Sequence, residues 1–169
     1  SKTARKSVDV YSSEKMNVVY AGAMSRVQKP EILLKAYSHL CRIDSRWSSR
    51  TVVHFFGPES PYFRIAIRKW LSEGCNYGGF LPQKDIVYCI EQADIGFFSL
   101  SDDTYAYATP TKLFDYIEAG IPIVAALPHG VSRQIIEEHK IGLVANPDDI
   151  VGLANCLKTM VEDEDVRKN

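Results

Sequence analysis

Residues 109–124 read TPTKLFDYIEAGIPIV, and this run contains the start of a helix, its end and the strand that follows. Thr109 is a favourable N-cap, and Pro110 suits the first helical position because the N–H that proline lacks would be unpaired there. Gly120 is typical of a helix C-terminus, and the apolar residues after it predict a strand over residues 122–126. The run therefore predicts one helix–strand unit with well-marked boundaries.

The same alternation continues on both sides of this unit. Runs rich in Val, Ile and Phe predict strands, and each is followed by a run whose apolar residues recur every three to four positions, as in a helix that buries one face. We expect strands over residues 17–21, 51–56, 77–81, 94–100, 122–126 and 143–145, and helices over residues 30–41, 62–71, 84–92, 110–119, 132–139 and 149–161. The strand DIGFFSL is apolar on both faces, as strands of parallel sheets are. The sequence therefore predicts an α/β fold, a Rossmann-like doubly wound parallel sheet of about six strands with helices on both faces.

Length and composition predict one domain. The chain has 169 residues, of which 46% are hydrophobic, and this is enough for one core of ordinary size. Residues 1–15 are polar and have no helical or strand period, so we expect a linker or disordered segment there, followed by a domain over residues 16–169. A cut at a domain boundary and an ordinary frayed terminus both fit such a start.

Charge and cysteine content argue against several classes of protein. The 20 Lys and Arg residues nearly balance the 21 Asp and Glu residues, so we do not expect nucleic acid as a partner. No apolar run reaches the roughly 18 residues of a transmembrane helix, and the first residues lack the core of a signal peptide, so we expect a cytoplasmic protein. The four cysteines form no CxxC pair and lie in apolar stretches. They are expected to be reduced core residues, and no metal site is expected.

The loops after the strands are where a ligand is expected, because open parallel sheets bind ligands at the carboxyl ends of their strands. The first amides of the helix after Pro110 are those of Thr111, Lys112 and Leu113. They lie at the positive end of the helix dipole, which stabilises an anion. Lys112 adds a full charge, and Asp115 lies one turn deeper, where a carboxylate can accept hydrogen bonds from vicinal hydroxyls. This arrangement predicts a site for a diphosphate next to a ribose.

Five runs of sequence support a more specific interpretation. They are VVYAGAMSRVQKPEILLKA, VHFFGPE, GGFLPQKDIVYCIEQADIGFFSL, PTKLFDYIEAGIPIVAA and IGLVANPDDIVGLANCLKTMVED, and they cover nearly all of the chain after Lys15. In this order and spacing they resemble the C-terminal domain of the family-four (group-one) glycosyltransferases, enzymes of GT-B fold with two Rossmann-like domains. The resemblance implies a domain that binds a nucleotide-diphosphate sugar, with UDP-sugar favoured. It also implies that the N-terminal acceptor domain is absent from this chain.

The resemblance also assigns roles by position. It implies that Asp115 holds the ribose hydroxyls, in place of the glutamate usual in the family. It implies that Lys112 and the amides of Lys112 and Leu113 hold phosphate, and that Phe80 and Leu81 border the base.

Two positions depart from the family pattern. The family places an arginine beside the glycine after its first strand and a lysine before the next helix, but here Ala23 follows Gly22. Arg26 and Lys29 are the candidates to replace this basic pair, and Gly22 itself would let the backbone approach phosphate closely. Tyr107 stands where many members have an acid near the donor sugar. The expected catalytic cations are therefore the lysine of the helix start, Arg26 and Lys29.

The expected chemistry is glycosyl transfer assisted by electrostatics. Breaking the bond to the anomeric carbon leaves charge on the diphosphate, and a helix N-terminus with nearby cations can stabilise that charge without a metal. The domain alone is expected to bind nucleotide and to turn nothing over. In the parent protein it would act in the cytoplasm, with peripheral contact to a membrane left open.

Two alternatives remain at this point. One is half of a nucleotide-sugar epimerase or phosphorylase of the same fold. The other is a non-enzymatic α/β regulatory module, which would have acidic residues directly after its first strand. A dinucleotide-binding dehydrogenase and a P-loop NTPase are disfavoured, because neither GxGxxG nor GxxxxGK[ST] is present.

Overall fold

The computed structural model describes residues 2–70, 74–101 and 111–169. The strands are β1 (Met16–Ala21), β2 (Thr51–Phe56), β3 (Cys75–Gly79), β4 (Ile95–Ser99), β5 (Ile123–Ala126) and β6 (Gly142–Ala145). They form one six-stranded sheet in the order β3-β2-β1-β4-β5-β6, and every pairing is parallel. The predicted α/β fold is confirmed.

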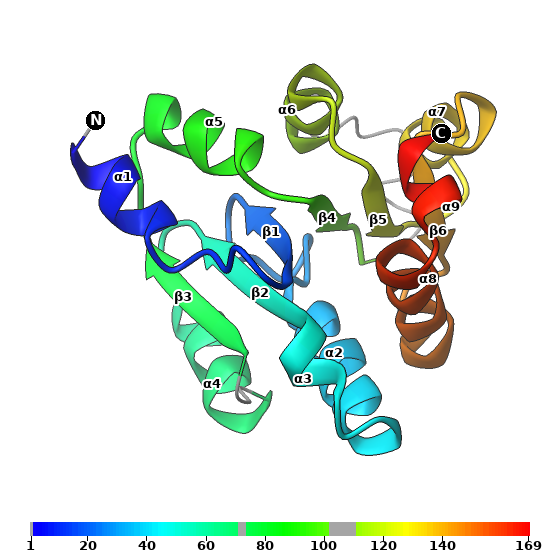
Figure 1. Ribbon diagram of the computed structural model, residues 1–169, viewed down its shortest axis with the longest axis horizontal. Helices are drawn as coiled ribbons and strands as arrows, with labels where there is room; N and C mark the ends of the chain where they lie inside the picture. The colour runs from blue at the N-terminus through cyan, green and yellow to red at the C-terminus, as the bar shows by residue number, and fades with distance from the viewer. Residues whose placement is uncertain (1, 71–73, 102–110) are drawn as a thin grey trace.

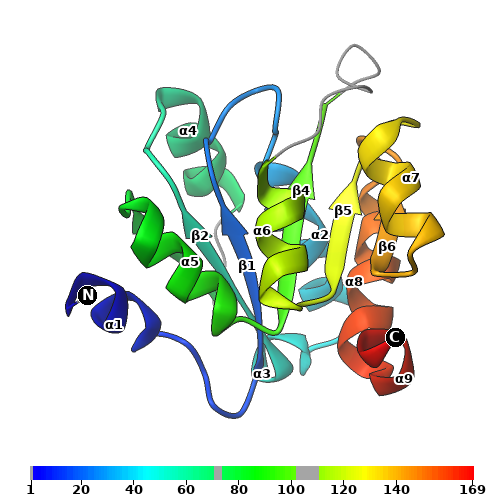
Figure 2. The ribbon, with the colours of Figure 1, turned by 90° about the horizontal axis from the view of Figure 1, so that it is seen from above.

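Helices cover both faces of this sheet. They are α1 (Lys2–Val8), α2 (Glu31–Ile43), α3 (Trp47–Arg50), α4 (Pro61–Trp70), α5 (Gln83–Glu91), α6 (Thr111–Ala119), α7 (Val131–Glu138), α8 (Ile150–Glu162) and α9 (Glu164–Lys168). Figure 1 shows α1, α5 and α6 on one face and α2, α4 and α8 on the other. In the view of Figure 2 the strands run in one direction, with α6 in front of the sheet and α2 and α8 behind it.

The two layers of helices bury two separate sets of strand residues. Along β1, Val18 and Tyr20 belong to the cluster that packs against α2 and α8, whereas Val19 and Ala21 belong to the cluster that packs against α5 and α6. Successive side chains of a strand point to opposite faces, so a strand buried on both sides must be apolar throughout. This is the physical reason for the continuous apolar runs in the sequence.

The connections that follow β1 and β4, which are neighbours in the sheet, run to opposite faces of it. The chain leaves β1 for α2 on one face, and it leaves β4 for α6 on the opposite face. In doubly wound folds such a divergence marks a crevice at the carboxyl ends of the two strands, and this is the position at which these folds bind their ligands.

Four elements differ from the sequence-based expectation. The helices α1, α3 and α9 were not expected, and β3 covers Cys75–Gly79 rather than residues 77–81. The expectation that residues 1–15 have no regular element is wrong for α1. The segment after α1 is fixed by Tyr11, whose ring stacks on His54 at 4.2 Å and whose hydroxyl donates to the Cys89 carbonyl oxygen. Tertiary contacts, rather than a local pattern, hold this part of the chain.

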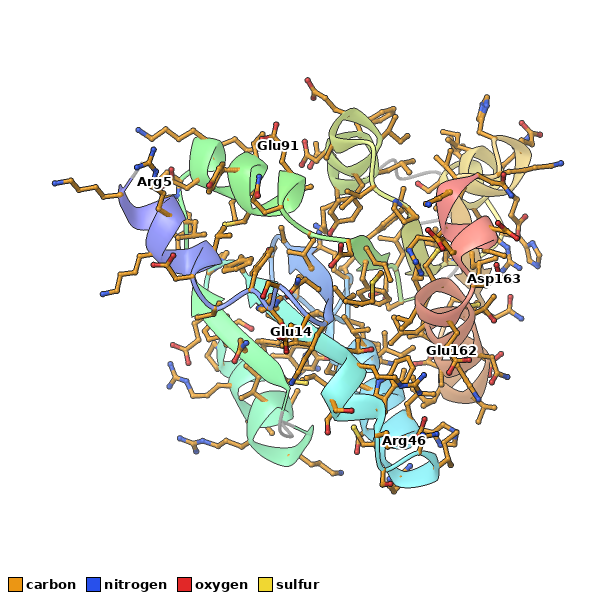
Figure 3. All side chains as sticks on the ribbon, in the orientation of Figure 1. Arg5, Glu14, Arg46, Glu91, Glu162 and Asp163 are labelled. Atoms are coloured by element: carbon orange, nitrogen blue, oxygen red, sulfur yellow. The ribbon has the colours of Figure 1, made fainter. Side chains whose placement is uncertain are left out.

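Charged side chains of both signs lie at the periphery of the fold. Figure 3 shows Arg5 and Glu91 on the side of α1 and α5, and Arg46 and Glu162 on the opposite side. None of the helices in the described part of the chain combines the length and the apolar character that crossing a bilayer requires.

Candidate functional site

The floor of the candidate site is main chain, because the three strands β1, β2 and β3 end in glycine at the same level. The Gly22 amide donates to the Phe56 carbonyl oxygen at 2.8 Å, and the Gly57 amide donates to the Gly79 carbonyl oxygen at 2.9 Å. Gly22 has φ 152° and Gly57 has φ 156°, and a Cβ on Gly57 would collide with the Gly22 carbonyl group. Residues with side chains fit neither position, so a ligand can approach the backbone closely there.

Lys112 reaches over this floor from the first turn of α6. Its side chain is only 6% exposed, and its ammonium lies 5.4 Å from the centre of the Tyr20 ring. A Cβ on Gly22 would lie 2.9 Å from Lys112 Cε and closer still to Nζ. Among the described residues the ammonium has no ion-pair partner. At the carboxyl end of β1, next to β4, the structure therefore places a cation that has no ion-pair partner within the described part of the chain.

Burial changes the protonation of this lysine. It lowers the pKa of Lys112 from its ordinary value of 10.5 to about 8, and the nearby Asp115 carboxylate acts in the opposite direction. Lys112 is thus largely charged at neutral pH, although burial opposes the charge. An anion that enters the crevice would remove this conflict.

Asp115 lies on the same side of α6 as Lys112, as the spacing of three residues predicted. Its carboxyl group is partly buried. Burial raises the pKa of that carboxyl, the Lys112 ammonium lowers it, and Glu118 raises it. Leu113 is fully buried in the core, whereas Thr111 is exposed at the start of the helix. The expected N-cap Thr109, Pro110 and Tyr107 lie outside the described residues.

The two other expected cations have partners of different kinds. The Arg26 guanidinium lies 5.3 Å from the centre of the Tyr62 ring, and Lys29 forms an ion pair with Asp148 in the loop before α8. Both residues follow β1, so they lie at the edge of the sheet formed by the carboxyl ends of the strands, where the ligand is expected. Lys29 is thus neutralised by a carboxylate, whereas Arg26, like Lys112, lies against an aromatic ring.

The loop after β1 also crosses the end of β4. The Ser101 amide donates to the Val27 carbonyl oxygen at 2.8 Å, and the Ser99 hydroxyl donates to the carbonyl oxygens of Gln28 and Lys29. These bonds fix the loop across the crevice. The β1–α2 loop therefore forms one wall of the candidate site.

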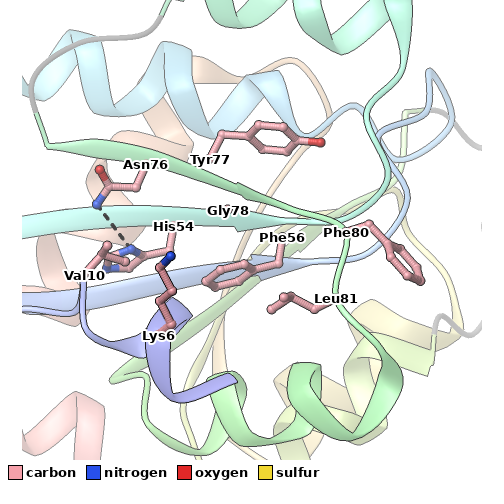
Figure 4. Close-up of a pocket in the computed structure, with 9 residues that line it drawn as sticks. All are labelled: Lys6, Val10, His54, Phe56, Asn76, Tyr77, Gly78, Phe80 and Leu81. Carbon is pink, nitrogen blue, oxygen red and sulfur yellow. Dashed lines mark hydrogen bonds between the residues drawn. The ribbon is translucent and has the colours of Figure 1, made fainter. Parts of the chain in front are cut away.

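The expected base-binding residues lie at the end of β3, two strands away from Gly22. The Phe80 ring is 71% exposed and Leu81 is buried. Both line a cavity of about 440 Å³ between the β2–β3 face and α1, which Figure 4 shows with Phe56 and Gly78 beside them. Two strand spacings of about 4.8 Å separate this end from Gly22, so the floor is about 10 Å wide.

The deep end of this cavity is built around a neutral histidine. His54 is fully buried, and burial lowers its pKa to about 4. One ring nitrogen pairs with Asn17 Oδ1 at 3.0 Å, and the other accepts from the Asn76 amide at 3.4 Å (Figure 4). His54 was not among the expected site residues, because a histidine inside an apolar strand gives no signal of its surroundings.

Two further residues that contact the expected site residues were not expected from the sequence. Tyr20 lies under Lys112, but in the sequence it is one apolar residue of a buried strand. Asp148 pairs with Lys29 across 119 residues of sequence, and no local pattern indicates such a contact. No cluster of three or more metal-ligating side chains occurs among the residues that the structure describes.

The chain belongs to the glycosyl transferases group 1 family, whose model matches residues 2–169. The fold is that of GT-B glycosyltransferases, as the comparison with solved structures also shows. An apo structure of OtsA superposes with a TM-score of 0.74 at 14% identity, over 99% of this chain and 43% of that chain. None of the curated protein sequences matches the chain significantly.

Two further structures carry sugar-related ligands. A point mutant of S. aureus TarM in complex with fondaparinux, alpha-GlcNAc-glycerol and UDP has a TM-score of 0.72 at 14% identity, over 92% of this chain and 30% of that chain. A UDP-forming alpha,alpha-trehalose-phosphate synthase from Burkholderia xenovorans, in complex with glucose-6-phosphate, has a TM-score of 0.73 at 12% identity, over 99% of this chain and 39% of that chain. The chain thus spans less than half the length of each of these proteins. Neither the family nor these neighbours favour the epimerase, phosphorylase or regulatory-module alternatives.

Proposed function

We propose that this domain binds the nucleotide diphosphate of a sugar donor across the carboxyl ends of β3, β2, β1 and β4. The observation that carries the proposal is the buried Lys112 ammonium over the glycine floor, which has no ion-pair partner among the described residues. A buried cation without a partner is costly, and a crevice at the switch point of a doubly wound sheet is where such folds hold ligands. A diphosphate supplies the missing negative charge.

The same geometry suggests where the diphosphate, the ribose and the base of the nucleotide would lie. The first turn of α6 offers helix amides to the diphosphate beside Lys112, and Asp115 one turn deeper accepts hydrogen bonds from the ribose hydroxyls. The base lies at the other end of the floor, against Phe80 and Leu81. UDP is favoured as the nucleotide, because the TarM structure contains UDP and the trehalose-phosphate synthase is named as UDP-forming.

In the parent protein this arrangement would assist glycosyl transfer. As the bond between the anomeric carbon and the β-phosphate oxygen breaks, negative charge develops on the diphosphate. Lys112 and the α6 amides would stabilise that charge, and no metal takes part in this proposal. The acceptor would come to the domain from another part of the parent chain, so the 169-residue chain alone is expected to bind nucleotide without transferring sugar.

Thermal shift and calorimetry with UDP, GDP and ADP test the proposal, with UMP as the ligand that lacks the second phosphate. At about 100 times its dissociation constant, a ligand adds roughly 2.7 kcal/mol of stability, which raises the unfolding midpoint of a domain of this size by roughly 5–10 °C. UDP should bind more tightly than UMP. Lys112→Ala and Asp115→Ala should each weaken UDP binding, whereas Lys158→Ala, at an exposed lysine in α8, should not.

Two results would contradict the proposal. If none of the three diphosphates moves the midpoint while a divalent cation alone does, the site is that of a regulatory module. If UDP binds equally to the wild-type, Lys112→Ala and Asp115→Ala chains, the nucleotide site lies elsewhere.

A further inference from the structure

Lys112 and its aromatic neighbour come from opposite layers of the fold. Lys112 belongs to α6, which covers one face of the sheet, whereas the Tyr20 ring belongs to the core cluster on the other face, under α2 and α8. The lysine side chain crosses the carboxyl end of β1 where Gly22 leaves space for it. The ammonium is thus held where two packing layers meet.

The Tyr20 ring has little freedom to move. It is fully buried, and it lies between Phe55 on β2 at 6.0 Å and Phe97 on β4 at 6.3 Å, measured between ring centres. This row of three rings follows from strand register, because Tyr20 is paired with Phe55 across the β1–β2 ladder. A ring fixed in this way presents the same face to Lys112 in every molecule.

The Tyr20 hydroxyl holds the β1–α2 loop, which forms one wall of the candidate site. It donates to the Ala23 carbonyl oxygen at 2.5 Å, and Ala23 is the second residue of the β1–α2 loop. Burial raises the pKa of the Tyr20 phenol well above its usual value, so the hydroxyl keeps the proton that it donates. One side chain therefore touches both the cation and the loop.

We propose that Tyr20 is a positioning residue for the phosphate site, whose ring holds the Lys112 ammonium and whose hydroxyl holds the β1–α2 loop. The proposal rests on the proposed function, since it assigns Lys112 to phosphate. A cation within about 6 Å of an aromatic centre is attracted to the negative face of the ring, and the attraction is stronger where water is excluded. Tyr20 thereby keeps the ammonium charged and aimed at the floor before any ligand arrives.

The first test needs no ligand. The chain is labelled with ¹³Cε-lysine, the Lys112 signal is identified by its loss in Lys112→Met, and the signal is titrated by NMR. Replacement of Tyr20 by phenylalanine keeps the ring, and replacement by 3,4,5-trifluorophenylalanine keeps the shape but removes the negative face. The titration midpoint of Lys112 should stay in Tyr20→Phe and fall by about one pH unit in the fluorinated chain.

The matched control is Tyr37→Leu. Tyr37, a residue of α2, is also fully buried, and its hydroxyl donates to the Thr51 carbonyl oxygen at 2.9 Å, at the end of β2 opposite to Gly57. Tyr20→Leu and Tyr37→Leu should both lower stability, because each removes a buried ring, but Tyr37→Leu should leave the Lys112 midpoint unchanged. Equal Lys112 midpoints in the phenylalanine and trifluorophenylalanine chains would contradict the role of the Tyr20 ring. A shift of the Lys112 midpoint in Tyr37→Leu would mean that general core packing, and not the Tyr20 ring, sets the midpoint.

The second test concerns the hydroxyl. Tyr20→Phe releases the Ala23 carbonyl group, so UDP affinity should fall by about threefold while its dependence on pH stays the same. Unchanged affinity would remove the hydroxyl from the proposal. Absence of UDP binding to the wild-type chain would contradict the proposed function, whereas the ligand-free NMR midpoints decide the role of the ring separately.

Discussion

Gly22 and Lys112 occupy one space at the end of β1: the position of a side chain on Gly22 is taken by the end of the Lys112 side chain. The glycine therefore leaves space for a residue 90 positions further along the chain, in addition to having a backbone angle that favours glycine. This relationship connects a loop residue to the charge that we assign to phosphate.

Gly22→Ala should displace the Lys112 ammonium from the crevice. We expect UDP affinity to fall by at least tenfold, which corresponds to about 1.4 kcal/mol, as measured by isothermal calorimetry. Gly120→Ala is the control, because Gly120 also has a positive φ, 70°, but a Cβ there meets nothing within 4 Å. Both variants should lose stability through backbone strain, and only Gly22→Ala should lose affinity. Equal affinities in the two variants would contradict the shared space.

Lys112→Met should make the ligand-free domain more stable while abolishing tight binding of UDP. Because burial lowers the pKa of Lys112 from 10.5 to about 8, the unfolded chain binds more protons than the folded one between these values. Stability should therefore rise with pH across this window by up to about 3 kcal/mol, and below pH 8 the whole cost of burying the charge is present. Urea unfolding at pH 7 and pH 10 measures this. The rise should be absent from Lys112→Met, and an equal rise in both chains would contradict it.

UDP affinity should decrease as pH rises through 8. The diphosphate requires the protonated lysine, and a bound anion raises the pKa of Lys112, so the affinity of the free site falls by up to tenfold per pH unit above 8. Calorimetry between pH 7 and pH 9.5 gives the profile. Lys112→Arg, whose guanidinium keeps its charge over this range, should have a flat profile at a lower affinity. A flat wild-type profile would exclude Lys112 as the titrating group.

Lys29 should contribute little to nucleotide binding. Its charge is already neutralised by Asp148, in a pair whose carboxylate side chain is 62% exposed. Lys29→Met should reduce UDP affinity by less than threefold, and Asp148→Asn should change the free energy of unfolding by less than about 1 kcal/mol. A loss as large as that in Lys112→Met would mean that Lys29 leaves Asp148 and joins the phosphate site.

His54 should make the domain sensitive to acid. Its pKa is lowered from 6.5 to about 4 by burial, so below pH 6.5 the unfolded chain binds a proton that the folded chain does not. The stability contributed by the neutral ring is complete above pH 6.5 and is lost as pH falls to about 4, by up to about 3 kcal/mol. His54→Phe keeps a ring against Tyr11, and Asn17 Oδ1 still accepts from the Ser12 amide. This variant should lose less stability than the wild type between pH 7 and pH 4.5.

The sheet was predictable because burial on both faces leaves a continuous apolar run, as in β1 and β4. β3 was placed two residues too late, because it is an edge strand that carries Gly78 and Gly79 and is only partly buried, so its pattern is weak. The short α1 and α3 were missed for another reason. They are stabilised by contacts such as the Tyr11–His54 stack and the burial of Trp47, which do not repeat with a helical period.

The site was predictable as far as local sequence determines it. The α6 start placed Lys112 and Asp115 on one side of a helix, because their separation is fixed by helix geometry. The partners of that lysine were not predictable, because Gly22 and Tyr20 reach it through the order of the strands in the sheet. The expected roles of all these site residues, Lys112 and Asp115 included, remain predictions, and the ion pair with Asp148 argues against the role expected of Lys29.

In the proposed function, the glycine floor formed by Gly22, Gly57 and Gly79 separates two kinds of recognition. Its surface bears no side chains, so it offers the same peptide groups to any nucleotide placed on it. Selectivity among donors must therefore arise at its two ends, from the residues after β3 for the base and from the α6 start for the charged group. A change of donor during evolution would alter those ends and leave the glycines in place.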